Sequence, residues 1–258
     1  MLSRRSFLSG SLCLAPGLAA PTILTGASRG PVHALIIGSG RYDKMADVPH
    51  AAADAALIAR TLRGLGVEVS EASDLPRESI LVALSRFRLA LSQSRTAVFY
   101  YVGHGMMRGG ITHLLGTDFE PERPAQGQSV PLNGVLRAIS DRPRSKALFL
   151  DAGRRNAAWD AQARAFAGVL APINQFAPIG THISYATQPG APAPGSTGGP
   201  SAYAWALSQA LARPGLSMEE VATQVNLAVV QETQGQQVPW AQSMQVTPLV
   251  LNQGNRDS

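Results

Sequence analysis

Two short segments with chemically useful residues each follow an apolar run in this sequence. His104 stands between Gly103 and Gly105, directly after the run Thr96 to Val102. Asp151 begins the segment Asp-Ala-Gly, which ends at Gly153 and directly follows Ala147 to Leu150. An imidazole can act as a general base, and a carboxylate can bind a cation or orient a base. Small neighbours let a substrate approach the backbone closely. We therefore treat both segments as parts of one candidate site.

The elements that must position these segments alternate between strands and helices. The short apolar runs indicate strands buried on both faces, and leucine and isoleucine at helical spacing indicate helices between them. We predict strands at Val32 to Ile37, Val67 to Val69, Thr96 to Val102, Ala147 to Leu150, His182 to Thr187 and Val246 to Leu251, with helices at Ala51 to Leu65, Pro76 to Leu91, Leu132 to Ile139, Ser201 to Leu211 and Ser217 to Thr233.

This alternation predicts an α/β fold in three layers, with a mostly parallel sheet and helices on both of its faces. Catalytic and binding sites in such sheets form at the carboxyl ends of the strands. Both candidate segments lie at such ends. The proline- and glycine-rich stretch from Gly190 to Gly199 is predicted to be a loop.

The N-terminus has the pattern of an export signal. Arg4 and Arg5 precede an apolar run that extends from Phe7 to about Ala20, which resembles a twin-arginine signal. We expect residues 1–27 to be a signal peptide, with cleavage after Ala19 or Ala27, and residues 28–258 to form one domain in the periplasm or outside the cell. The run is too short and too broken for a spanning helix, so stable membrane insertion after cleavage is not expected.

Removal of the signal changes what the composition implies. The only cysteine is Cys13, so the mature chain would hold no thiol. The 22 basic and 17 acidic residues give +5, and the loss of Arg4 and Arg5 leaves 20 and 17, or +3. The arginines are scattered along the sequence, which argues against nucleic-acid binding.

No cofactor or metal is expected from the sequence. Gly38-Ser39-Gly40 after the first strand lacks the third glycine of a dinucleotide-binding motif. The remaining histidines are dispersed and do not have metal-ligand spacing, which favours loop or packing roles. They are His33, His50, His113 and His182.

Segments along nearly the whole chain resemble caspases and metacaspases of bacterial type, the C14 peptidases. They are His-Ala-Leu-Ile-Ile-Gly at His33, Ala-Asp-Ala around Asp54, Leu-Gly-Val-Glu-Val at Leu65, Phe-Tyr-Tyr-Val-Gly-His-Gly at Phe99, His-Leu-Leu-Gly-Thr-Asp at His113, Leu-Asp-Ala-Gly-Arg-Arg-Asn at Leu150, Tyr-Ala-Thr-Gln-Pro-Gly at Tyr185, Ala-Leu-Ser-Gln-Ala-Leu around Leu207 and Thr-Gln-Gly-Gln-Gln-Val-Pro-Trp at Thr233.

The resemblance implies a role for each matching residue. His104 would be the general base, Gly105 a backbone donor to the oxyanion, and Asp151 an acid in the substrate-binding pocket. The nucleophilic cysteine of the family falls on Gly153, which has no side chain to attack with. The acidic residue expected near Gly195 is also absent.

These features favour a pseudoprotease that binds a peptide or a protein partner and is catalytically inactive or nearly so. The alternative is a hydrolase that uses an unrecognised nucleophile. Four hydroxyl side chains are candidates for that role, namely Thr112, Ser129, Ser184 and Thr187.

Overall fold

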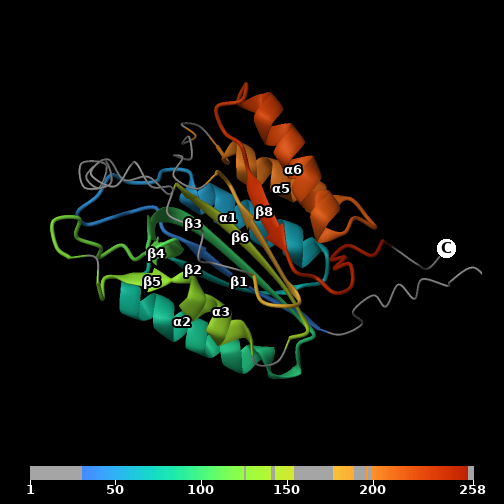
Figure 1. Cartoon of the computed structure of the whole chain (residues 1–258), viewed down its shortest axis with the longest axis horizontal. Helices are drawn as coiled ribbons and strands as arrows, with labels where there is room; N and C mark the ends of the chain where they lie inside the picture. The colour runs from blue at the N-terminus through green and yellow to red at the C-terminus, as the bar shows by residue number, and fades with distance from the viewer. Residues whose placement is uncertain are drawn as a thin grey trace, which may run out of the picture.

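A twisted, mostly parallel sheet forms the centre of the molecule (Figure 1). The computed structural model describes residues 31–124, 126–140, 143–153, 177–188, 196 and 199–254. The predicted signal peptide and Cys13 lie outside the described residues, as does the Gly190 to Gly195 part of the predicted loop. The strands are β1 (Val32–Gly38), β2 (Glu68–Ser73), β3 (Thr96–Arg108), β4 (Ile111–Leu115), β5 (Ser129–Pro131), β6 (Ser145–Gly153), β7 (Thr181–Tyr185) and β8 (Trp240–Ser243).

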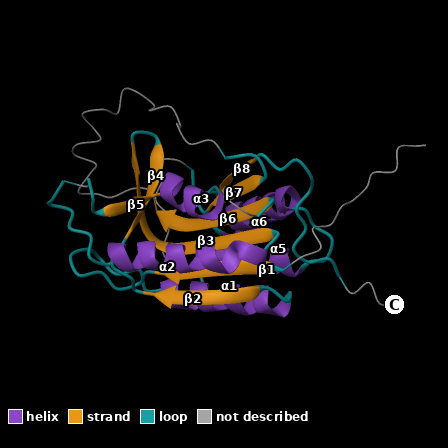
Figure 2. Ribbon diagram, turned by 90° about the horizontal axis from the view of Figure 1, so that it is seen from below, coloured by secondary structure: helices purple, strands orange, loops and turns teal. Residues whose placement is uncertain are grey.

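The strand order is β2-β1-β3-β6-β7-β8, and all neighbours are parallel except β7 and β8. β4 and β5 extend the far end of β3 as a small antiparallel ribbon. Figure 2 shows the strands lying side by side with helices in front of them and behind them. The predicted α/β fold with helices on both faces is therefore confirmed.

Within the described ranges, helices from two groups cover the two faces of the sheet. The first group consists of α1 (Ala51–Gly64), α5 (Ala202–Ala212) and α6 (Met218–Glu232). The second group consists of α2 (Arg77–Ala90) and α3 (Leu132–Ser140). The helix α2 continues into the 3-10 turn η1 (Leu91–Gln93). Ser217 begins α6 with a capping box that includes Glu220, a pattern that fixes a helix start from sequence alone.

The alternation along β3 explains how one strand contributes to two cores. Tyr100 faces the core under α1, α5 and α6, whereas Phe99 and Tyr101 face the core under α2 and α3. All three side chains are fully buried. A strand buried on both faces needs a continuous run of apolar and aromatic residues, which is why its sequence signal is so clear.

One predicted strand is wrong. The segment from Val246 to Leu251 is not a strand, although Val250 forms an isolated bridge with Ser217. Leu249 and Leu251 are instead buried in the core under α5 and α6, and Pro248 cannot donate to a strand ladder. The strand at the edge beside β7 is Trp240–Ser243, whose residues are half-buried, so no apolar run marks it in the sequence.

β3 is also longer than predicted. It continues through His104 to Arg108 and exchanges its parallel neighbours for the antiparallel β4 from Gly105 onward. His104 therefore lies within a strand and not in a loop after it, which fixes its backbone on both sides.

Candidate active site

His104 on β3 and Gly153 on β6 meet at the carboxyl ends of two neighbouring strands. The parallel register pairs Val102 with Asp151 and His104 with Gly153. The two candidate segments of the sequence are thus adjacent in space, as the strand-end argument predicts. Gly153, the last residue of β6, contributes only backbone at this position.

The imidazole of His104 is held as a neutral base. Its Nε2 lies 2.7 Å from the carbonyl oxygen of Ala46, and since a carbonyl only accepts, Nε2 carries the proton and Nδ1 keeps its lone pair. Burial lowers the pKa of His104 below its usual value, and the hydrogen bond to Ala46 opposes this effect only in part. The ring is therefore uncharged at neutral pH.

Two tyrosines that the sequence analysis did not single out fix the backbone around His104. The amide of His104 donates to the hydroxyl of Tyr42 over 2.8 Å, and the Tyr42 ring packs on the imidazole with centroids 4.6 Å apart. The hydroxyl of Tyr101 lies 2.8 Å from the carbonyl oxygens of both His104 and Leu115. Tyr101 belongs to the apolar run of β3, so its sequence signal was that of a core residue.

Gly103 makes this tyrosine arrangement possible. A Cβ at this position would lie 2.7 Å from the Tyr42 hydroxyl oxygen and 2.8 Å from that of Tyr101, and the backbone φ is +154°. Real Cβ atoms do not approach oxygen so closely. Glycine at position 103 is therefore needed because the Tyr42 and Tyr101 hydroxyls lie too close for any side chain there.

Asp151 belongs to a buried cluster beside the strand ends, in contact with Asp54 of α1. Asp151 is 4% exposed and Asp54 is fully buried. Asp151 Oδ2 accepts from the hydroxyls of Ser201 at 2.8 Å and Tyr100 at 3.2 Å, while Asp54 Oδ1 accepts from the Ser201 amide at 2.7 Å. Ser201 is the N-cap of α5, so the cluster ties this helix to α1 and β6.

Ionisation of both buried carboxyl groups, those of Asp54 and Asp151, is energetically unfavourable. Burial raises the pKa of both, and the charge on Asp151 further helps to raise the pKa of Asp54 to about 7. Among the described residues neither forms an ion pair with lysine or arginine, and the only imidazole within range, His50 Nε2, is 3.9 Å from Asp54 Oδ2. One carboxyl proton is therefore retained by the pair near neutral pH. Asp54 was not among the predicted site residues, although it belongs to one of the segments that resemble the C14 peptidases.

Several other hydroxyl and histidine side chains lie away from His104 and Gly153. Ser129 lies 2.9 Å from Nδ1 of His113, and Ser184 accepts from Tyr203 over 2.9 Å on the α5 side. His33 contacts Glu68 and Ser94. His182 is 1% exposed and has no hydrogen-bond partner in the described part of the chain. Within the described residues, no group of three potential metal ligands is found.

The comparison with known families agrees with this geometry. A family model described as the caspase domain matches residues 31–250. The chain belongs to the caspase domain family. No curated protein matches it closely enough to be informative. The caspase domain thus includes every described strand and both strand ends of the candidate site. No helix in the described ranges is long and apolar enough to cross a membrane.

Proposed function

We propose that this chain is an exported pseudoprotease of the caspase family that binds a peptide or protein partner and does not cleave it. The observation that carries the proposal is the pairing of His104, held as a neutral base, with Gly153, which has no functional group. A cysteine protease needs a thiol beside the imidazole. The imidazole of His104 would supply the base, whereas Gly153 offers no thiol.

The residue roles rest on the resemblance in sequence. We assign Gly153 to the vacated nucleophile position, the Gly105 backbone to the oxyanion donor and Asp151 to contacts with the partner. The carboxyl groups of Asp151 and Asp54 lie together near the strand ends. In the described part of the chain, neither has a lysine or arginine counterion. A basic side chain of a bound peptide would displace the retained proton and satisfy both.

The rival reading, a hydrolase with another nucleophile, has less support from the geometry. Ser184 on β7 pairs with Phe149 on β6. Phe149 comes four residues before Gly153, so Ser184 lies about 13 Å from the level of Gly153 along the strand direction. Ser129 is paired with His113. Thr187 follows β7 closer to the strand ends but is 1% exposed.

Export by the twin-arginine route is part of the proposal and rests on Arg4, Arg5 and the apolar run that follows them. Fractionation of cells that produce the full chain, with N-terminal sequencing of the product, tests it. A periplasmic product that begins near residue 20 or 28 supports export. A full-length cytoplasmic product contradicts it.

The proposed lack of peptidase activity is tested with fluorogenic peptides that end in Arg, Lys or Asp. The mature protein is compared with its Gly153→Cys variant. We expect hydrolysis only by the variant, because the base is already in place. Hydrolysis by the unmodified protein would overturn the proposal, and labelling by a serine-directed probe would then identify the nucleophile.

The proposed binding of a partner beside His104 is tested by affinity capture with a variant in which a large side chain fills this position. Gly153→Phe adds a large side chain beside His104, and Gly64→Phe adds the same side chain at the end of α1, where a Cβ meets no atom within 4 Å. A partner retained by the unmodified protein and by Gly64→Phe but lost with Gly153→Phe is the expected result. Retention by all three proteins would place binding elsewhere.

A further inference from the structure

A small pocket lies between α6 and the part of the sheet formed by β7 and β8. Its volume is about 400 Å³, within the range of about 300 to 1,000 Å³ that ligand pockets occupy. β7 contributes His182 and Ser184 to the lining, and β8 contributes Ala241 and Ser243. The register pairs His182 with Ser243 and Ser184 with Ala241, so their side chains face the same side of the sheet. We call this hollow the α6–β8 pocket.

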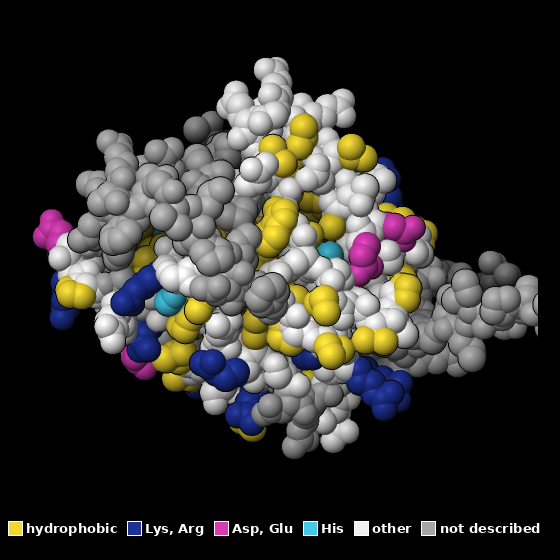
Figure 3. Space-filling view, viewed as in Figure 1, with side chains coloured by type: hydrophobic (Ala, Val, Ile, Leu, Met, Phe, Trp, Pro, Cys, Tyr) yellow, Lys and Arg dark blue, Asp and Glu magenta, His cyan; other side chains and the backbone are white. Residues whose placement is uncertain are grey.

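The helix α6 gives the pocket a negative charge and some apolar surface. Glu219 lies in the first turn of α6 and lines the pocket together with Ala222 and Leu227. No lysine or arginine is among the described lining residues. The Glu219 carboxylate accepts a hydrogen bond from the Ser243 hydroxyl, and it forms no ion pair within the described ranges. Figure 3 shows acidic side chains beside a histidine where α6 and β8 meet.

An acidic residue in a first helical turn also stabilises its helix, so Glu219 alone does not define a site. The second observation is the imidazole of His182, which is 1% exposed and whose two ring nitrogens have no hydrogen-bond partner in the described part of the chain. Native structures rarely leave buried polar groups unpaired. An unpaired imidazole in the lining of a pocket therefore points to a ligand that supplies the missing partner.

The His182 ring is neutral and can accept a hydrogen bond. Burial lowers the pKa of His182 to about 4, although the charge on Glu219 opposes this effect. At neutral pH one ring nitrogen therefore keeps its lone pair. A neutral ring does not repel a cation that is bound to the neighbouring carboxylate.

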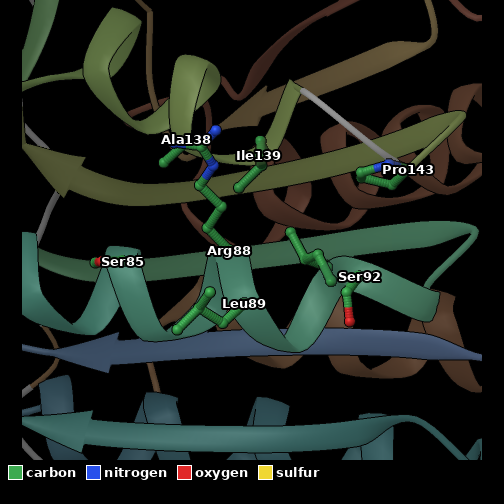
Figure 4. Close-up of a pocket in the computed structure, with 8 residues that line it drawn as sticks. Ser85, Arg88, Leu89, Ser92, Ala138, Ile139 and Pro143 are labelled. Atoms are coloured by element: carbon green, nitrogen blue, oxygen red, sulfur yellow. The ribbon is translucent and has the colours of Figure 1, made fainter.

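The larger hollow between α2 and α3 lacks such a group. Its volume is about 520 Å³, and its lining includes Arg88, Leu89 and Ile139 (Figure 4). No described residue of that lining has a buried polar side-chain atom without a partner. The α6–β8 pocket is therefore the better candidate for a ligand site.

The polar groups of the α6–β8 pocket select one class of ligand. The Glu219 carboxylate and the lone pair of the His182 ring both accept hydrogen bonds, and an ammonium group donates three and accepts none. We propose that the α6–β8 pocket binds a primary ammonium group on an alkyl chain, with the cation on Glu219 and His182 and the chain against Ala222 and Leu227. A lysine side chain of a partner protein and a free diamine share this chemistry.

This site is distinct from the candidate active site. His182 pairs with Ala147, which comes six residues before Gly153 on β6. The separation is about 20 Å along the strand direction. The proposal therefore does not depend on the function proposed above.

The test uses isothermal titration calorimetry at low salt with two ligands that carry the same group. One is 1,5-diaminopentane, and the other is a short capped peptide with one lysine between glycines. The matched controls are 1,5-pentanediol and the same peptide with its lysine acetylated, which lack the charge. We expect an amine to bind and its control to bind at least about tenfold more weakly. Binding of the diamine identifies a small amine as the source of the group, and binding of the peptide alone identifies a lysine of a partner chain.

Variants locate the site. Glu219→Gln removes the charge of an exposed side chain and is expected to weaken binding of the amine at least about tenfold. Glu232→Gln makes the same change at the last residue of α6, where the side chain is also exposed, and should leave the affinity within about twofold. His182→Phe should weaken binding and also raise the melting temperature of the ligand-free protein, because two unpaired buried nitrogens are removed. A role in packing alone predicts no change in affinity. Circular dichroism checks that each variant is folded.

Four results would overturn the proposal. They are no binding of either amine, equal binding of the amines and their uncharged controls, equal weakening by Glu219→Gln and Glu232→Gln, and an affinity that a folded His182→Phe variant leaves unchanged.

Discussion

His104 and Gly153 are direct register partners on β3 and β6. The Nε2 of His104 donates to the carbonyl oxygen of Ala46, and the backbone amide of His104 donates to the Tyr42 hydroxyl. A neutral imidazole is thus positioned next to a residue that has no side chain.

If Gly153→Cys restores hydrolysis, that activity must depend on His104. Adding His104→Ala to this variant is expected to lower kcat/KM by a factor of about 10² to 10⁴, the usual contribution of a positioned acid or base. His113→Ala in the same background is the control, because His113 is paired with Ser129 on β4 and β5. An equal loss in both double variants would show that the effect is structural.

Gly103→Ala should destabilise the fold and displace His104. The added Cβ would clash with the Tyr42 and Tyr101 hydroxyls, and relief requires one of the two to move. We expect a loss of about 1 to 3 kcal/mol in the free energy of unfolding, measured with urea. Gly64→Ala, where the Cβ meets no atom within 4 Å, should be neutral or slightly stabilising, since alanine favours a helix over glycine.

Tyr101→Phe removes the hydroxyl that lies 2.8 Å from the carbonyl oxygens of His104 and Leu115, of which the Leu115 contact is buried. The expected cost is about 1 to 3 kcal/mol in the free energy of unfolding, the usual penalty for leaving buried polar groups unpaired. Tyr185→Phe is a suitable comparison, since that hydroxyl accepts a longer 3.3 Å contact from Gln242 that is only partly buried. A similar loss in both variants would contradict a special role for Tyr101.

The Asp54 and Asp151 pair should make the protein less stable as the pH rises. The pKa of Asp54 is raised from 3.8 to about 7, so between these values the folded state binds more protons than the unfolded state. Stability therefore decreases as pH increases through this window, by at most about 1.4 kcal/mol per pH unit for one proton. Asp54→Asn keeps an acceptor for the Ser201 amide and should flatten this slope and stabilise the protein at pH 8.

The control for that measurement is Asp43→Asn, which alters an exposed carboxylate. Thermal unfolding between pH 4 and pH 8 compares the two variants with the unmodified protein. A slope that Asp54→Asn leaves unchanged would show that the pair does not hold a proton.

The sequence by itself determined the strands and helices whose signal is local. β1, β3 and β6 are buried on both faces, so their residues form continuous apolar runs, and Ser217 with Glu220 marks the start of α6. The same apolar runs predicted that His104 and Asp151 lie near the carboxyl ends of β3 and β6. Parallel strands bring their carboxyl ends to one edge of a sheet, which is why the pairing of these two segments could be predicted.

Only the tertiary structure decided what depends on distant partners. β8 is an edge strand whose four residues are all half-buried, so no periodic pattern marks it. The contacts of Tyr42 with His104 and of Asp54 with Asp151 join segments roughly 60 and 100 residues apart. His182 on β7 and Glu219 on α6 line one pocket only because α6 packs on this face of the sheet. Local propensity cannot encode such juxtapositions, because they arise from the packing of whole elements against one another.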